Sequence, residues 1–343
     1  MTLAVRKGGD CDTSPAAGLD CAAMNIAIPD DYHKLVRTLD CIGLLKGHEV
    51  HTFNDAAPPT ARLIEQLRNA EIIVPIRERT RFTREIIEAL PKLKMFSQTG
   101  RSCHHIDLDA CNELGIAVAA GSHASPYTVA EQTWAMILGS LREIPAETAL
   151  MKAGQWRSRF SFGLKGRTLG VYGLGTIGSL VAATGASFGM RVLVWGRDKS
   201  LAEARACGYE TAANREDFFA QSDVLVLMVR LSKETRGLVS AQDLARMKPT
   251  ALLVNTARAE LIAPGVLEAA LKAGRPGYAA IDVYENEPVL GGKHPLLELE
   301  NVLCTHHSAW LERETYELYF GEAFANAAAF AAGQTLKLVN NPR

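Results

Sequence analysis

Short apolar runs alternate with helical patterns along the first part of the chain. The apolar runs NIAI, HEVHTF, EIIVPI, LKMFS and IAVAA are separated by segments such as HKLVRTLDCIGLL and TARLIEQLRNA, whose apolar positions recur with helical spacing. This alternation is typical of β-α units that build a parallel sheet. We therefore predict an α/β domain over residues 24–125, preceded by a loose N-terminal extension over residues 1–23.

A second β-α series occupies the middle of the chain. It follows a long helical pattern, PYTVAEQTWAMILGSLREIPAETALMKAG, that is broken only by Pro145. The strand-like runs TLGVY, MRVLVW, DVLVLMV, ALLVNT, YAAIDVY and NVLCT then predict a Rossmann domain over residues 126–308. The stretch ERETYELYFGEAFANAAAFAAG predicts a final helix ended by Gly333. Its return to the first domain would make that domain discontinuous, comprising residues 24–125 and 309–343.

The composition narrows the classes of function. The 343-residue chain has a formal net charge of −1, so its overall charge predicts no nucleic-acid or membrane partner. Its seven cysteines are scattered and form no C-x-x-C pair, which argues against a disulfide framework and favours a reducing cytoplasm. The two adjacent histidine pairs, at 104–105 and 306–307, lack the spacing of metal ligands, so we predict no metal site.

The segment GLGTIG follows the run TLGVY and opens a helical pattern. Gly173 would permit the tight turn, Gly175 would let the backbone approach a pyrophosphate, and Gly178 would allow close packing of helix on strand. The N-terminus of the helix that follows would direct N–H donors and the positive end of its dipole at the phosphates, and Thr176 and Ile177 are further candidates for cofactor binding. The flanking strand and helix favour a dinucleotide site over a purely structural turn.

The predicted second strand of this domain, MRVLVW, ends without the acidic residue that usually binds the ribose hydroxyls. Arg197 follows it instead and could pair with a 2′-phosphate through its planar guanidinium group. We therefore predict NADP as the preferred cofactor. NAD stays possible, because Asp198 comes next and could reach the ribose.

Three ionisable residues follow three of the predicted strands in the second half of the chain. Arg258 follows ALLVNT, Glu287 lies in the loop after YAAIDVY, and His307 follows NVLCT. In open parallel sheets, ligands bind beyond the carboxyl ends of the strands. We therefore expect these three side chains to converge on one site.

The segments GLGTIG, VNTARAELI, DVYENEP and NVLCTHH resemble, in order and context, those of the D-isomer-specific 2-hydroxyacid dehydrogenase family. The resemblance extends from about residue 25 to the end of the chain. It implies two Rossmann-like domains, of which the substrate domain is flavodoxin-like, and a homodimer with its interface around residues 126–153. The site residues that it implies are Arg258, Glu287 and His307 for catalysis, and Thr256 and Asp282 for the cofactor.

The reduction of a 2-oxo acid needs a proton donor and a group that binds the carboxylate. His307 would donate the proton to the developing alkoxide. Glu287, bonded to the other ring nitrogen, would hold the ring and favour its protonated form. Arg258 would bind the substrate carboxylate and polarise the 2-oxo group, because a guanidinium offers two donors in one plane.

Four further residues are candidates for the site. The family's carboxylate-binding loop corresponds to TGRSCHHID, where Arg101 and Ser102 are expected to offer backbone donors, and the alternative is a plain strand-to-helix turn. Arg230 either contacts the adenosine half of the cofactor or is a solvated loop residue. Trp310, just after His307, is expected to form a wall of the substrate pocket.

The predicted activity is hydride transfer between a nicotinamide cofactor and a small D-2-hydroxy or 2-oxo acid of the glyoxylate or hydroxypyruvate type. Two alternatives stay open. A formate or phosphite dehydrogenase could use the same scaffold, and a non-enzymatic NAD(P)-binding sensor or co-repressor could retain the same three residues.

Overall fold

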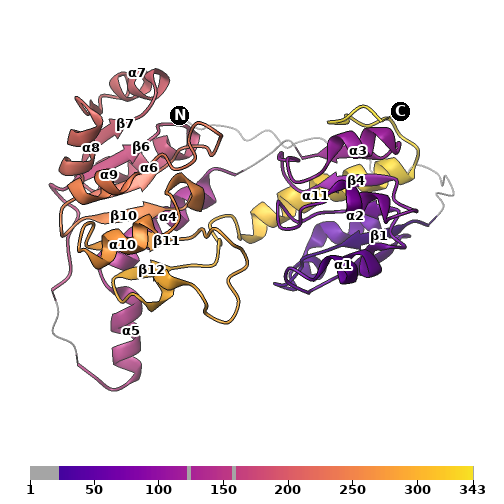
Figure 1. Ribbon diagram of the computed structural model, residues 1–343, viewed down its shortest axis with the longest axis horizontal. Helices are drawn as coiled ribbons and strands as arrows, with labels where there is room; N and C mark the ends of the chain where they lie inside the picture. The colour runs from indigo at the N-terminus through magenta and orange to yellow at the C-terminus, as the bar shows by residue number, and fades with distance from the viewer. Residues whose placement is uncertain (1–22, 122–124, 157–159, 343) are drawn as a thin grey trace, which may run out of the picture. The chain divides into compact units, whose positions relative to one another are not determined.

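The computed structural model of the protein describes residues 23–121, 125–156 and 160–342. The chain divides into two compact units, drawn in Figure 1, with Met1–Ser122 and Phe320–Arg343 in the first and His123–Tyr319 in the second. The second division falls inside helix α11 (Arg313–Ala331), whereas the sequence placed that boundary at residue 308. Both units contain a sheet of parallel strands, as the alternation of apolar runs and helical patterns predicted.

The sheet of the first unit has the strand order β2-β1-β3-β4-β5, which is the flavodoxin-like order. All the pairings between its strands are parallel. Every residue of β4 is buried, as expected for a parallel strand that is covered on both faces. The strands are β1 (Asn25–Ile28), β2 (Glu49–Thr52), β3 (Ile72–Ile73), β4 (Met95–Gln98) and β5 (Ala117–Ala120).

Helices pack on both faces of this sheet. The helices α1, α2 and α3 form a buried cluster with strand residues that include Phe96. The next residue, Ser97, points to the opposite face, where its hydroxyl donates a hydrogen bond of 2.6 Å to the carbonyl oxygen of Ala323 on α11. The bounds of the first three helices are α1 (Thr60–Leu67), α2 (Arg84–Glu88) and α3 (Leu108–Glu113).

The segment HKLVRTLDCIGLL, which we predicted as one helix, forms two short 3-10 helices, η1 (Val36–Thr38) and η2 (Asp40–Leu45). Leu39 separates them, because its backbone is extended, with φ −82° and ψ 142°, and its side chain is buried. The carboxylate of Asp31 accepts hydrogen bonds from two N–H groups at the start of η1. The prediction of one helix was wrong because Leu39 is buried in an extended conformation, which interrupts the helical hydrogen bonds.

The second unit has a seven-stranded parallel sheet in the order β12-β11-β10-β9-β6-β7-β8. Numbered from β6, its first six strands follow the 3-2-1-4-5-6 order of the Rossmann fold, and β12 extends one edge. The order reverses between β6 and β9, whose carboxyl ends therefore flank the expected ligand crevice. The strands are β6 (Thr168–Tyr172), β7 (Arg191–Trp195), β8 (Glu210–Thr211), β9 (Val224–Leu227), β10 (Leu252–Asn255), β11 (Tyr278–Ile281) and β12 (Val302–Cys304).

Helices also cover both faces of the second sheet. Side chains from α4, α6 and α7 pack with Val171 on one face, whereas α8, α9 and α10 pack with Tyr172 on the other. Within the described ranges, no helix is both long and apolar enough to cross a membrane. The bounds are α4 (Tyr127–Leu141), α6 (Thr176–Ser187), α7 (Asp198–Ala206), α8 (Arg215–Gln221), α9 (Ala241–Arg246), α10 (Val266–Lys272), and for the 3-10 helices η3 (Ala259–Leu261) and η4 (Pro295–Glu298).

The long helical pattern is divided near Pro145, as predicted. Helix α4 ends at Leu141, Glu143 adopts φ +52°, and α5 (Ile144–Lys152) begins with Pro145 in its first turn. Proline is tolerated there because the first N–H groups of a helix have no partner within it. Helix α4 is largely buried, but α5 buries none of its residues and extends away from the sheet of its unit (Figure 1).

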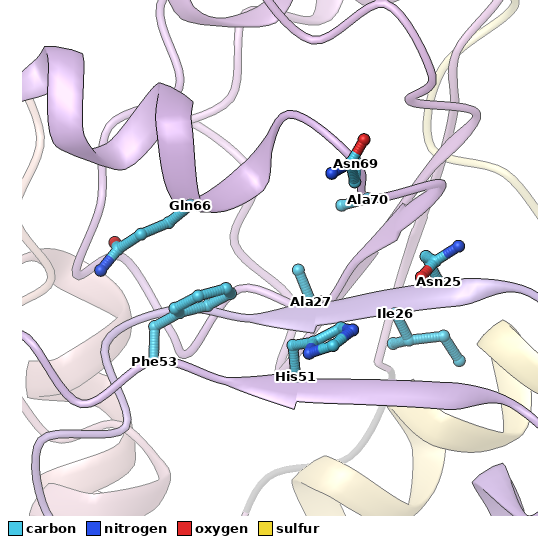
Figure 2. A pocket seen from close by; sticks show the side chains of 8 residues that line it. All are labelled: Asn25, Ile26, Ala27, His51, Phe53, Gln66, Asn69 and Ala70. Carbon is cyan, nitrogen blue, oxygen red and sulfur yellow. The ribbon is translucent and has the colours of Figure 1, made fainter.

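A small cavity lies between α1, β1 and β2 in the first unit (Figure 2). Its volume is about 130 Å³, below the ~300–1,000 Å³ of typical ligand sites and close to the space of a few water molecules. We assign no function to it. It is lined by Asn25, Ile26, Ala27, His51, Phe53, Gln66, Asn69 and Ala70.

Candidate functional site

The turn between β6 and α6 needs each of its three glycines for a different reason. Gly173 has a φ of +95°, and a Cβ atom there would lie 2.9 Å from the carbonyl oxygen of Met228. A Cβ atom on Gly178 would overlap the carbonyl oxygen of Gly173, so α6 approaches the strand closely only without a side chain. At Gly175, in contrast, no atom lies within 4 Å of where a Cβ would be. The space beside this backbone is therefore open.

The start of α6 can receive an anion. Gly175 is the N-cap of the helix and contributes no side-chain hydrogen bond, and both Gly175 and Thr176 are exposed. The first N–H groups of the helix are thus without a capping side chain. Ile177 packs against the core cluster and anchors the first turn. These residues fit the pyrophosphate of a dinucleotide, whose negative charge would meet the positive end of the helix dipole.

The loop after β7 runs beside this turn. The hydroxyl oxygen of Ser200 accepts a hydrogen bond of 3.2 Å from the N–H of Leu174. Arg197 is exposed at the N-cap of α7, and Asp198 is the first residue of that helix. Both residues that we weighed for the ribose therefore lie next to the glycine-rich turn.

The loop after β9 lies on the other side of β6. Its first exposed residue is Arg230, whose carbonyl oxygen accepts a hydrogen bond of 2.8 Å from the Thr235 hydroxyl. Further along, the Ser232 hydroxyl donates to Glu234 over 2.6 Å. This bond lowers the pKa of the Glu234 carboxyl, and the Arg197 guanidinium lowers it further. The loops that carry Arg197 and Arg230 therefore approach each other near the end of β6.

The three loops that carry Arg258, Glu287 and His307 begin at the aligned ends of three neighbouring strands. The strand register pairs Asn255 of β10 with Ile281 of β11, and Ile281 with the last residue of β12. Arg258 follows soon after the first of these strands and His307 soon after the third, and the loop from β11 carries Glu287. The parallel sheet therefore brings all three loops to the same edge.

His307 and Glu287 form a hydrogen-bonded pair. His307 Nδ1 lies 2.6 Å from Glu287 Oε2, and the two side chains are 27% and 33% exposed. The other carboxylate oxygen of Glu287 accepts the N–H of Tyr284 over 2.9 Å. Because Nδ1 is engaged by the carboxylate, Nε2 is the ring nitrogen available for proton transfer. The contact that we predicted between the two side chains is present.

The turn around His307 is held by the carboxylate of Asp282, which has no exposed surface. One oxygen accepts hydrogen bonds from the Thr305 hydroxyl (2.5 Å) and the Ser308 N–H (2.9 Å), and the other accepts the Ala309 N–H (3.0 Å). The bracketed residue, His307, adopts φ +54°. The resemblance implied a cofactor contact for Asp282, which stays a prediction, and the structure shows that this carboxylate positions the turn.

Tyr284 links the loop of Glu287 to the end of β12. Its N–H binds Glu287, and its buried hydroxyl donates a hydrogen bond of 2.8 Å to the carbonyl oxygen of Thr305. Burial raises the pKa of the Tyr284 phenol, so the group stays a neutral donor. Sequence reasoning missed Tyr284, although a polar aromatic residue directly after a buried strand and three positions before Glu287 was a visible signal.

The backbone of Arg258 is fixed by the side chain of Asn255. The amide of Asn255 donates to the Arg258 carbonyl oxygen (2.9 Å) and accepts the Ala257 N–H (3.1 Å). The half-buried guanidinium of Arg258 donates from Nη1 to the Ala257 carbonyl oxygen over 2.7 Å. Thr256, which the resemblance assigns to the cofactor, is buried, and its hydroxyl lies 2.8 Å from that of Thr133 on α4.

Besides Arg258, two of the substrate-binding candidates lie in the first unit and one in the second. Arg101 is exposed in the loop after β4, and the Ser102 hydroxyl lies 2.6 Å from His104 Nδ1. Trp310 is buried and stacks on Tyr316, with ring centroids 4.8 Å apart. Their contacts with a substrate stay predictions.

The histidine pair of the first unit has a different character. Burial lowers the pKa of His105 to about 4, so this imidazole is neutral near pH 7. Its ring lies 5.9 Å from that of His104, with the planes close to perpendicular. Among the residues that the structure describes, no group of three or more His, Cys, Asp or Glu side chains is arranged to hold a metal ion.

Residues 134–309 match the family model of the D-isomer specific 2-hydroxyacid dehydrogenase, NAD binding domain. A glyoxylate reductase from Aeropyrum pernix is 34% identical over 286 residues, which cover 81% of this chain and 84% of that protein. A D-3-phosphoglycerate dehydrogenase from Methanocaldococcus jannaschii is 38% identical over 247 residues, or 71% of this chain, which spans about half (47%) of that relative's length. The crystal structure of a phosphoglycerate oxidoreductase from Vibrio cholerae is 45% identical, with a TM-score of 0.87 over 90% of this chain and 99% of that one.

Substitution of Gly175 by alanine is expected to weaken dinucleotide binding without unfolding the protein. The added methyl group meets no protein atom within 4 Å, yet it occupies the space where a pyrophosphate would approach. We expect the Kd for NADPH and NADH, measured by fluorescence titration, to rise at least about tenfold with an unchanged Tm. Gly178→Ala is the matched control. In contrast to Gly175→Ala, it should lower the Tm, because its methyl group overlaps the Gly173 carbonyl. Equal nucleotide affinity of the Gly175→Ala variant and the wild type would contradict the assignment.

Proposed function

Because the chain belongs to the D-isomer-specific 2-hydroxyacid dehydrogenase family, we propose that it transfers a hydride between a nicotinamide cofactor and a small D-2-hydroxy or 2-oxo acid of the glyoxylate or hydroxypyruvate type. The observation that carries the proposal is the bonded pair of His307 and Glu287, which shares a sheet edge with the loop of Arg258. The open turn at Gly175 adds a place for the cofactor in the same unit. A proton donor, a guanidinium group and a nucleotide cradle are what the reduction of a 2-oxo acid requires.

The nicotinamide, when bound, supplies the hydride for reduction and accepts it in oxidation. His307 donates a proton from Nε2 to the 2-oxo oxygen of the substrate as negative charge develops on that atom. Glu287 accepts a hydrogen bond from Nδ1–H of the ring, which fixes the orientation of the imidazole. In the oxidative direction the neutral Nε2 removes the proton of the 2-hydroxyl group.

Arg258 binds the carboxylate of the substrate through two parallel N–H donors. Its positive charge also stabilises the charge that develops on the neighbouring 2-oxo oxygen. The hydrogen bond from Asn255 keeps the Arg258 backbone in place. We propose the loop at Arg101 and Ser102 as a second contact for the carboxylate, and Trp310 as a wall of the pocket.

The turn Gly173–Gly178 would hold the pyrophosphate, and we propose NADP as the preferred cofactor, with NAD as the second choice. Arg197 supports this preference, because it is exposed next to the turn and no carboxylate occupies the end of β7. Arg230 approaches from the loop after β9 and adds a second positive charge at the adenosine end. Thr256 and Asp282, at the ends of β10 and β11, are proposed neighbours of the nicotinamide.

We further propose a homodimer that assembles through the α4–α5 region. Helix α5 buries none of its residues, and its Ile144 and Met151 are 55% and 56% exposed. Trp156 and Phe160, which follow it, are 90% and 97% exposed. Exposed large apolar side chains that recur along one segment of the chain are typical of a protein interface.

A cytoplasmic location is proposed as well. All the cysteines that the structure describes are free thiols. A protein without disulfides among these residues suits a reducing compartment.

Substitution of His307 by alanine should lower kcat for glyoxylate or hydroxypyruvate by about 10²-fold or more, which is the usual contribution of general acid–base catalysis. Glu287→Gln keeps the shape of the side chain but removes its charge, so it should lower kcat less and shift the pH–rate profile. Steady-state assays with NADPH and NADH measure both effects. Fluorescence titration serves as the control, because both variants should bind the cofactor like the wild type.

Assays of formate, phosphite and several 2-oxo acids with the wild type separate the proposal from its alternatives. Oxidation of formate or phosphite with no reduction of 2-oxo acids would identify a different dehydrogenase on this scaffold. Tight cofactor binding without turnover of any of these substrates would indicate a sensor or co-repressor. Undiminished turnover by the His307→Ala variant would reject the role of the imidazole.

The wild type is expected to use NADPH more efficiently than NADH. Arg197→Ala should lower kcat/KM for NADPH about tenfold with little change for NADH, because it removes one charge-assisted contact to the 2′-phosphate. Arg205→Ala, an exposed position in the last turn of the same helix, is the matched control. A strong preference of the wild type for NADH would refute the argument from Arg197.

The double substitution Ile144→Glu and Met151→Glu should convert the dimer into a monomer, because it places two charges in an apolar interface. Sedimentation velocity measures the change. Leu114→Glu is the matched control, since this leucine is 49% exposed in the first unit, outside the α4–α5 region. A wild type that sediments as a monomer at micromolar concentration would contradict the proposed assembly.

A further inference from the structure

The second unit contains a cavity that is separate from the proposed reaction site. Its volume is about 650 Å³, within the ~300–1,000 Å³ that small-molecule sites occupy. It lies beside the ends of β10 and β11, between the segment 259–268 and the loop 285–296. The described residues that line it include none of Arg258, Glu287 and His307.

The floor of this cavity is apolar. Ile262, Leu267, Ile281 and Val283 line it, and each is less than 10% exposed in the chain as a whole. Leu290, on the loop, is 60% exposed and continues the apolar lining toward the solvent. Such a surface favours the hydrocarbon part of a ligand over a fully hydrated ion.

Lys293 is the one charged side chain of the lining without a partner among the residues that the structure describes. Glu268 forms an ion pair with Lys272 (2.7 Å), and Glu285 accepts a hydrogen bond from His294 Nε2 (3.2 Å), while His294 Nδ1 accepts the N–H of Leu296. Lys293 is exposed and forms no hydrogen bond or ion pair with any of these described residues. The carboxylate of a ligand can therefore pair with the Lys293 ammonium group.

We propose that this cavity is a second ligand site, which binds a small amphipathic monocarboxylate. The hydrocarbon body of the ligand lies on the apolar floor formed by Ile262 and Leu267, and its carboxylate pairs with the Lys293 ammonium group. The ligand is larger and more apolar than the 2-oxo acids of the proposed reaction, so the two sites select different molecules.

Ligand binding at this site affects the reaction residues through residues that are close to them in the sequence. Asn286 and Pro288 line the cavity on either side of Glu287. Asn255 lines it as well, and its amide donates the 2.9 Å hydrogen bond to the carbonyl oxygen of Arg258. A ligand that shifts this loop therefore alters the position of Glu287 and changes turnover without taking the place of the substrate. This regulatory part rests on the proposed function, whereas the binding part does not.

Calorimetric titration of the full-length protein with octanoate tests the binding part. Octanoate is expected to bind, and its neutral isostere 1-octanol should bind at least about tenfold more weakly. Lys293→Gln should raise the Kd for octanoate about tenfold, and Leu290→Glu should abolish binding by placing a like charge on the rim. Lys165→Gln is the matched control and should leave the Kd unchanged, because this exposed lysine precedes β6 at the opposite end of the parallel strands.

The proposal is overturned if octanoate does not bind, or if the wild type and the Lys293→Gln variant bind it equally. Competitive displacement of octanoate by oxalate would also overturn it, because it would locate octanoate in the reaction site. These titrations contain no substrate or cofactor, so their outcome is independent of whether the protein transfers a hydride. In assays at saturating glyoxylate, octanoate should change kcat, and an unchanged kcat despite binding would refute the coupling.

Discussion

The buried carboxylate of Asp282 is the interaction on which the rest of the site depends. A charge removed from water is tolerated only where hydrogen bonds replace its hydration, and here the donors are Thr305, Ser308 and Ala309. Because these donors bracket His307, the requirement to satisfy Asp282 also fixes the backbone that presents the imidazole. Glu287 then has to reach only one ring nitrogen to complete the pair.

The parallel sheet supplies the second constraint. Its register aligns the ends of β10, β11 and β12, so loops that are far apart in sequence begin side by side. The Tyr284 hydroxyl then links the loop after β11 to the end of β12. The Asn255 amide links the loop after β10 to its own strand. The site is therefore assembled from short local contacts on the frame of the sheet.

Features that depend on local sequence could be predicted. The buried strands follow from the period of the apolar residues, and the division near Pro145 follows from the proline ring. The glycines of GLGTIG follow from steric contacts within a few residues. The convergence of His307 and Glu287 could be predicted because both follow strands of one sheet, and the family resemblance implied their pairing. What could not be predicted depends on distant partners: the turn at Leu39, the Thr133 partner of Thr256, and the donors that engage Asp282 all require the folded chain.

His307 adopts a left-handed backbone conformation, with φ +54°. For a residue with a side chain this costs about 1 kcal/mol relative to the right-handed region, whereas glycine would adopt it freely. Replacement by glycine would remove this cost, but it would also remove the hydrogen bond to Glu287, which contributes about 1–3 kcal/mol. A laboratory selection for heat resistance is therefore not expected to gain stability at this position, because the bond that orients the imidazole also offsets the cost of its backbone.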